Sequence, residues 1–156
     1  MKESRCEGGF TLLEILVVIT LILIIAGIAL PRFIGVGDEG RKAKAKAELK
    51  TVQTALESYL LNTSSTVPTA TWAALETALE GATPRLVGEM KDFIDPFGAT
   101  STTNYSFAKS ANSKYYVLFS VGPDKTADIT GIDDSGNITP TNPDDDIYVT
   151  NGQKAA

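Results

Sequence analysis

The sequence predicts an α+β protein that begins with a membrane helix, and two observations lead to this prediction. Residues 10–30 form an apolar run that is long enough to cross a bilayer. Farther along, a helical repeat of apolar residues that ends near residue 62 gives way to alternating, strand-like stretches at 104–109 and 114–121. A long N-terminal helix packed on a small antiparallel sheet is an α+β arrangement.

The composition is typical of a globular protein, and it argues against some classes of function. After the apolar run, roughly 120 residues remain, which is enough for one compact domain with a modest core. The chain has no histidine, and its single cysteine, Cys6, precedes the run. Because the commonest general base and metal ligand is missing, we expect no enzymatic activity. The net charge of -5 argues against a nucleic-acid partner.

The apolar run extends from Phe10 to Leu30. Four of its residues fall outside the aliphatic and aromatic classes: Thr11, Glu14, Thr20 and Gly27. At about 1.5 Å per residue it spans roughly 30 Å, which is longer than the apolar part of a signal peptide, and no small-residue cleavage site follows it. Pro31 marks the predicted end of the span, because proline interrupts the helical hydrogen-bond ladder. A single membrane-spanning helix is therefore predicted for residues 10–30.

Glu14 is the unusual residue of this span, because a carboxylate inside a membrane costs about 3 kcal/mol without a partner. In one interpretation, its side chain reaches the membrane edge or takes up a proton. In the other, cleavage before Phe10 creates an α-ammonium group near the level of the carboxylate. The ammonium group of a neighbouring subunit would then pair with Glu14 in a packed bundle.

The residues from Gly9 to Glu14, Gly-Phe-Thr-Leu-Leu-Glu, resemble the cleavage and assembly motif of type IV pilins and type II secretion pseudopilins. The resemblance implies that a prepilin peptidase cuts after Gly9, removes the leader 1–9 and methylates the new N-terminus at Phe10. It also implies that Glu14 and Pro31 act in assembly of a fibre.

Residues 31–40 are expected to form a joint between the span and a globular domain at 41–156. Gly35, Gly37 and Gly40 each weaken a helix by about 1 kcal/mol relative to alanine. The resemblance implies that such segments melt or stretch when subunits enter a fibre.

From residue 41 to residue 62 the pattern predicts a surface helix. Its apolar face consists of Ala45, Leu49, Val52, Leu56, Tyr59 and Leu60, and its basic residues are Arg41, Lys42, Lys44, Lys46 and Lys50. We interpret the basic residues first as a solvated face, and two further interpretations stay open. They would also suit anionic lipid, or the acidic C-terminal segment of another subunit.

A second, shorter helix is predicted within residues 69–81, with Trp72, Leu75 and Leu79 directed inward. The two stretches 104–109 and 114–121 are predicted to pair as strands around a turn at 110–113.

The segment between Ser120 and Tyr148 is strongly acidic. It carries one lysine and the aspartates Asp124, Asp128, Asp133, Asp134, Asp144, Asp145 and Asp146. One interpretation is a solvated loop, and the other is a site for a hard cation such as Ca²⁺, which takes six to eight oxygen ligands. An EF-hand that starts at Asp133 is rejected, because Ile138 stands where that loop needs glycine.

The C-terminal half is similar to the major pseudopilins of type II secretion, in its Asp-Pro-Phe-Gly at 95–98, its Ser-Val-Gly-Pro-Asp at 120–124 and its Asp-Asp at 145–146. This resemblance implies a structural Ca²⁺ site. Its principal ligands would be Asp124 and Asp145, with Asp146 and Ser120 in support and Asp144 as an alternate.

The resemblance also implies a function: a structural subunit of a type II secretion pseudopilus that polymerises through its N-terminal helix to drive protein export. The expected partners are membrane lipid before assembly, prepilin peptidase, further copies of the chain, minor pseudopilins and the inner-membrane assembly machinery. The expected location is the bacterial inner membrane, with a single pass and the C-terminal domain in the periplasm. The assembled fibre would lie in the periplasm or outside the cell.

Two alternatives stay open at this point. The first is a type IV pilus subunit that acts in adhesion, motility or DNA uptake. The second is a membrane-tethered calcium-binding module that does not polymerise.

Overall fold

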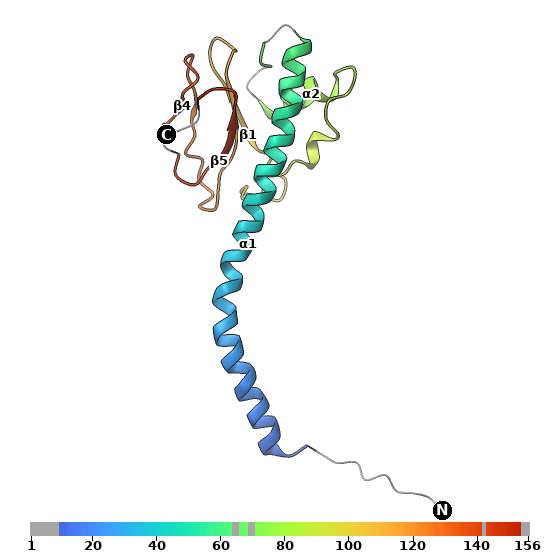
Figure 1. The fold of residues 1–156 in the computed structure, drawn as a ribbon. Helices are drawn as coiled ribbons and strands as arrows, with labels where there is room; N and C mark the ends of the chain where they lie inside the picture. The colour runs from blue at the N-terminus through green and yellow to red at the C-terminus, as the bar shows by residue number, and fades with distance from the viewer. Residues whose placement is uncertain (1–9, 64–65, 69–70, 142, 154–156) are drawn as a thin grey trace, which may run out of the picture. The chain divides into compact units, whose positions relative to one another are not determined.

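The computed structural model describes residues 10–63, 66–68, 71–141 and 143–153. The chain divides between Asp38 and Glu39 into two compact units. Helix α1 supplies residues to both units, and the second unit contains all the other elements (Figure 1). The elements are α1 (Leu12–Asn62), α2 (Trp72–Glu80), the 3₁₀ helix η1 (Met90–Asp92), β1 (Ser106–Lys109), β2 (Tyr116–Ser120), β3 (Gly131–Ile132), β4 (Ile138–Thr139) and β5 (Ile147–Thr150).

Helix α1 is continuous over 51 residues and passes through Pro31, where the sequence predicts the end of the membrane span and a local interruption of the ladder. A proline removes one N–H from the ladder and crowds the preceding turn, but the residues on both sides supply the other hydrogen bonds of the helix. The glycines of the 31–40 segment do not end the helix either. The boundary between the two units nevertheless falls inside this segment, after Asp38. That the segment stretches or melts in a fibre stays a prediction.

The second half of α1 buries the apolar face that its periodicity predicts. Ala45, Leu49, Val52 and Leu56 are fully buried, and they pack with residues of α2 and the sheet. These four side chains recur every three or four residues, so they lie along one face of the helix. The core of the globular unit therefore lies between this face and the elements that follow.

Helix α2 begins where its sequence predicts. Thr71 caps it by accepting a hydrogen bond from the backbone N–H of Ala74 at 3.2 Å. Leu75 and Leu79 are buried, as expected. Trp72 is partly buried, with its ring centroid 6.0 Å from that of Tyr105.

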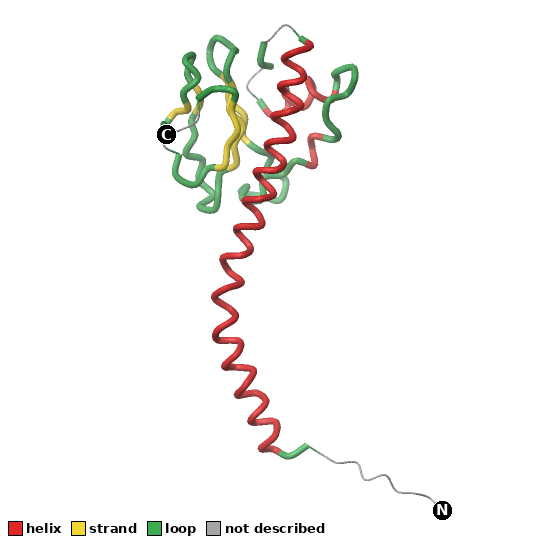
Figure 2. The backbone as a smooth tube through the Cα atoms, in the orientation of Figure 1, coloured by secondary structure: helices red, strands yellow, loops and turns green. Residues whose placement is uncertain are grey.

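Three antiparallel strands form the main sheet in the order β1, β2, β5, and β3 and β4 form a separate two-stranded ribbon (Figure 2). The predicted pairing of the first two strands is confirmed, with Phe107 opposite Leu118. On the other side of β2, Leu118 lies opposite Val149 of β5. The third strand was not predicted, because Ile147–Thr150 follows the aspartate run without a longer alternating pattern.

The acidic segment covers the face of the sheet that turns away from α1. Val117 and Phe119 of β2 are buried there against three isoleucines from the segment: Ile129, Ile132 and Ile138. Tyr116 and Leu118, on the opposite face, belong to the core that α1 covers. The acidic segment is therefore a packed layer of the domain, and its aspartates are held in place by buried apolar neighbours.

Candidate functional site

The N-terminal segment begins with a capped helix. The Glu14 backbone N–H donates to the Thr11 hydroxyl at 3.2 Å and to the Thr11 carbonyl at 3.1 Å. Thr11 is thus the N-cap of α1, a role that we did not predict, although Thr-x-x-Glu before an apolar run is the capping-box pattern. Phe10 lies just before this cap and is exposed, and Gly9 lies outside the described residues.

Residues Leu12–Ala29 form a helix that is long and apolar enough to cross a membrane, and it is the one such helix in the described part of the chain. Its large apolar side chains are exposed; they include Leu13, Leu16, Leu23 and Ile28. Exposed apolar surface of this extent is stable in lipid or against other apolar helices. Glu14 lies in the first helical turn, where the helix dipole favours a carboxylate.

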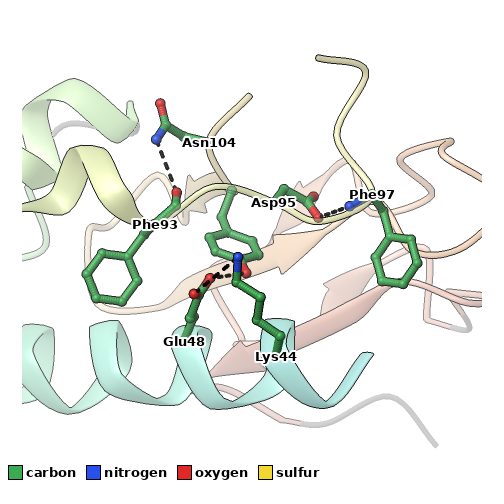
Figure 3. A network of polar contacts seen from close by, with 7 residues as sticks. Lys44, Glu48, Phe93, Asp95, Phe97 and Asn104 are labelled. Carbon is green, nitrogen blue, oxygen red and sulfur yellow. Dashed lines mark hydrogen bonds and ion pairs between the residues drawn. The ribbon is translucent and has the colours of Figure 1, made fainter. Parts of the chain in front are cut away.

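Asp95 is a buried residue, 3% exposed, whose carboxylate accepts three hydrogen bonds. One carboxylate oxygen accepts hydrogen bonds from the Ser120 hydroxyl at 2.6 Å and from the Phe97 N–H at 2.9 Å, and the other accepts from the Val121 N–H at 3.1 Å. Figure 3 shows the Phe97 contact. Asp95 therefore joins the 95–98 turn to the end of β2, where the acidic segment begins.

Replacing Asp95 by asparagine is expected to lower the free energy of unfolding by about 2 kcal/mol. Asp95 only accepts hydrogen bonds, so the amide NH₂ of asparagine would face a donor and leave a buried group unpaired. The urea midpoint of a fragment of residues 39–156, followed by circular dichroism, measures the loss. Asp92→Asn, at an exposed position nearby, is the control and should leave the midpoint unchanged.

A second set of contacts connects α1 with the segment that carries Asp95. The Tyr105 hydroxyl donates to Glu48 of α1 at 2.6 Å. Lys44 lies 3.7 Å from the other oxygen of Glu48 (Figure 3). The Asn104 side chain donates to the Phe93 carbonyl at 3.1 Å. Burial raises the pKa of Tyr105, and its hydrogen bond to Glu48 raises it further, so the hydroxyl stays a donor. These contacts are structural.

The carboxylates of the acidic segment mostly accept hydrogen bonds from the backbone of the same segment. Asp145 accepts from the Asp124 N–H at 2.8 Å. Asp146 accepts from the N–H groups of Asp128 and Ile129, at 2.9 and 2.8 Å. These hydrogen bonds connect residues 124–129 with residues 145–146, and the predicted ligands Asp124, Asp145 and Asp146 lie in these two segments.

One oxygen of Asp145 and one of Asp146 are buried and receive no hydrogen bond from any described residue. Buried polar atoms of this kind are rare and call for a physical explanation. Burial also raises the pKa of Asp146, and the nearby charges of Asp128 and Asp145 add to that rise, while two N–H donors oppose it. The ionised carboxylate is therefore disfavoured here, and a bound cation would offset that cost.

The two unpaired oxygens come from neighbouring residues and are the kind of ligand that Ca²⁺ prefers. Within the described residues, however, no three acidic, cysteine or histidine side chains converge on one point. The described side chains therefore do not form a cage of carboxylates, and a bound Ca²⁺ stays a prediction. Ser120, the predicted supporting ligand, is fully buried and donates to Asp95. Its role as a ligand stays a prediction.

Gly122 allows the two parts of this site to approach each other. Its φ is +68°, and a Cβ atom there would lie 2.5 Å from the Asp145 carbonyl oxygen. A side chain at this position would push Asp145 away, and the positive φ would strain any other residue. Gly122 is thus a site residue that we did not assign, although the Ser-Val-Gly-Pro-Asp motif contains it.

Two protein families match successive parts of the chain. The family described as "Prokaryotic N-terminal methylation motif" matches residues 4–30. The family described as "Type II secretion system (T2SS), protein G" matches residues 32–139. No solved structure matches the chain.

Several curated relatives are similar over most of their length. "Type II secretion system core protein G" of Escherichia coli (strain K12) is 33% identical over 132 residues, which cover 80% of this chain and 87% of the relative. The protein of the same name from Dickeya chrysanthemi is 29% identical, over 86% of this chain and 88% of the relative. "Type IV major pilin protein PilA" of Myxococcus xanthus (strain DK1622) is 41% identical, but over 38% of this chain and 28% of the relative. With the protein G match and these relatives, the chain belongs to the type II secretion system protein G family.

Proposed function

We propose that the chain is the major structural subunit of a type II secretion pseudopilus. The observation that carries this proposal is the order of the two family matches, with the methylation motif at 4–30 followed directly by the protein G domain at 32–139. The first match supports a precursor that is cut before Phe10 and methylated there. The exposed apolar helix that follows supplies the surface through which subunits pack after leaving the membrane.

The proposed function implies where the chain is located and which partners it has. The precursor sits in the inner membrane with a single span, and its globular unit lies in the periplasm. A prepilin peptidase matures it, and it then joins further copies of itself, minor pseudopilins and the inner-membrane assembly machinery. It acts as a structural subunit and not as an enzyme, as its family name and its lack of histidine both favour.

A surface type IV pilus is the second candidate, because one relative is a major pilin. That similarity covers 38% of this chain, whereas the protein G of Escherichia coli matches 80% of it. Membership in the protein G family therefore favours the secretion pseudopilus.

The function also includes a structural Ca²⁺ at the acidic segment, with Asp124, Asp145 and Asp146 as side-chain ligands. The buried, unpaired oxygens of Asp145 and Asp146 support this part of the proposal. Bound Ca²⁺ supplies positive charge there, and these residues would hold the 122–129 backbone against the start of β5.

Replacing Gly9 by valine is expected to stop maturation and with it export. A branched side chain next to the scissile bond would keep the precursor intact, so the α-ammonium group of Phe10 would not form. In a strain without the chromosomal copy, we expect the wild-type gene to restore export of type II substrates and the Gly9→Val gene to fail. Mass spectrometry of the N-terminus reports cleavage and methylation.

Gly8→Val is the matched control, because it lies one residue farther from the cut and should still be processed. Normal export by the uncleaved Gly9→Val chain would contradict the proposed function, and so would normal export in the strain that lacks the chain.

A further inference from the structure

A groove of about 830 Å³ runs along the globular unit between α1 and β5. Its lining from α1 comprises Glu39, Lys42, Ala43, Lys46, Lys50 and Gln53. Its lining from the C-terminal segment comprises Asp146, Ile147, Tyr148, Val149 and Thr150. Gln53 lies across one part of the groove and donates to the Thr150 carbonyl at 3.1 Å. The groove therefore has a basic side, from the helix, and a side made by a strand at the edge of the sheet.

The three lysines of the groove follow each other at four-residue intervals, so they lie along one face of α1. Lys42 lies 3.4 Å from Glu39, and Lys50 donates to the Gln53 side chain at 2.9 Å. Lys46, between them, is exposed and has no hydrogen bond or ion pair with any described residue. The middle of the groove thus presents an uncompensated positive charge.

The acidic segment carries a complementary charge. Six of its seven aspartates accept hydrogen bonds within the domain: Asp124 and Asp133, for example, accept from nearby backbone N–H groups of the segment, and Asp134 accepts from the Asn112 N–H. Asp144 differs: its backbone N–H donates to Asp128, but its exposed side chain contacts no described partner. Asp144 is therefore the one carboxylate of the segment without a side-chain contact among the described residues, and it can pair with a residue outside the domain.

We propose that the groove between α1 and β5 is a subunit contact that receives the acidic segment of a second copy, with Lys46 of one subunit paired to Asp144 of the next. The inference rests on the proposed polymerisation, and it adds which face of the globular unit contacts the next subunit. Charge complementarity supports this occupant, because the segment has seven aspartates and one lysine, whereas three lysines line the groove. Such pairs set partner choice and register more than affinity.

An anionic lipid would offer a phosphate to the same lysines, but the groove suits it less well. Glu39 and Asp146 also line the groove, and their carboxylates repel a phosphate group. A peptide segment brings its own N–H groups and its Lys125 to such carboxylates, so it can match both signs of charge. A second copy of the chain is therefore the favoured occupant.

The test exchanges the two charges in the full-length chain, in cells that assemble fibres from the wild-type protein. Lys46→Glu alone and Asp144→Lys alone are each expected to lower the yield of sheared fibres about tenfold, because like charges then face each other in every subunit contact. The double variant, Lys46→Glu with Asp144→Lys, restores the pair and should recover most of the yield. Lys114→Glu and Asp92→Lys change charge at exposed positions outside the groove, and they should leave the yield unchanged.

A cysteine pair measures the contact directly. After removal of residues 1–9 the chain has no cysteine, so Lys46→Cys on one chain and Asp144→Cys on another introduce the only thiols. Oxidised fibres should contain disulfide-linked dimers, and a Lys114→Cys partner in place of Lys46→Cys should not give them.

The outcomes separate this inference from the function on which it rests. Absence of wild-type fibres refutes the proposed polymerisation and this contact together. Normal wild-type fibres, with full yield from both single variants and no dimer from the cysteine pair, overturn the contact alone. A Lys46→Glu chain that is depleted from the membrane, but forms fibres in proportion to the amount present, assigns the groove to lipid and also overturns the contact.

Discussion

Replacing Glu14 by alanine is expected to abolish fibre assembly while leaving the chain in the membrane and correctly cleaved. The carboxylate is costly in the span, so alanine favours insertion by about 3 kcal/mol. In the fibre, the same change leaves the α-ammonium group of a neighbouring Phe10 unpaired in an apolar bundle. Removing one partner of a buried ion pair costs about 3 kcal/mol or more, which is about a hundredfold in each contact equilibrium.

The measurement is the amount of sheared fibre relative to the amount of processed subunit in the membrane. The backbone cap at Thr11 depends on the N–H of residue 14 and not on its side chain, so alanine leaves the start of α1 intact. Glu14→Gln tests the charge at nearly constant shape and should fail as alanine does. Glu89→Ala removes an exposed carboxylate outside both the span and the groove between α1 and β5, and it should assemble. Full fibre yield from Glu14→Ala would rule out the ion pair as the basis of assembly.

Removal of Ca²⁺ is expected to destabilise the globular unit. At a Ca²⁺ concentration 100 times its dissociation constant, binding to the folded state adds about 2.7 kcal/mol. For a domain of this size the melting temperature should then fall by roughly 10 °C when a chelator is added. A fragment of residues 39–156, which contains the whole buried core, is suitable for calorimetry with Ca²⁺, with Mg²⁺ and with chelator.

Asp145→Asn is the informative variant for this site. The asparagine carbonyl can still accept from the Asp124 N–H, while one buried negative charge is lost. We therefore expect the fragment to melt near the wild-type temperature in chelator and to gain nothing from Ca²⁺. Asp92→Asn should respond to Ca²⁺ as the wild type does. If chelation leaves the wild-type melting temperature unchanged, the acidic segment does not use Ca²⁺ for stability.

Local patterns predicted the helices and the first two strands well, because the apolar residues of each element repeat with the period of a helix or of a strand. The face of α1 that carries Leu49 and Leu56 is a clear case. At Pro31, where the sequence predicts the end of the span, the helix continues, because one missing hydrogen bond does not end a helix that is supported on both sides. The prediction missed β5, whose Ile147–Thr150 becomes a strand through its pairing with β2.

The candidate site was predictable in its residue types and not in its contacts. The motifs placed Asp124, Asp145 and Asp146 in one region, and the backbone bonds between these parts of the chain agree with that placement. No local pattern shows that Asp95, 25 residues before Ser120, binds the hydroxyl of that residue. Such a contact depends on how distant segments pack together, so the residues next to it in the sequence do not predict it.

By itself, the sequence determined the membrane-length apolar run at 10–30, the N-terminal methylation motif that overlaps it, and the family to which these belong. These are local features, set by composition and spacing over a few turns of chain. Only the tertiary structure decided that the acidic segment is a packed layer, that Asp145 and Asp146 each keep one unpaired buried oxygen, and that Lys46 lines a groove. The physical reason is that burial, pairing and exposure are properties of contacts between distant segments, which exist only once the chain has folded.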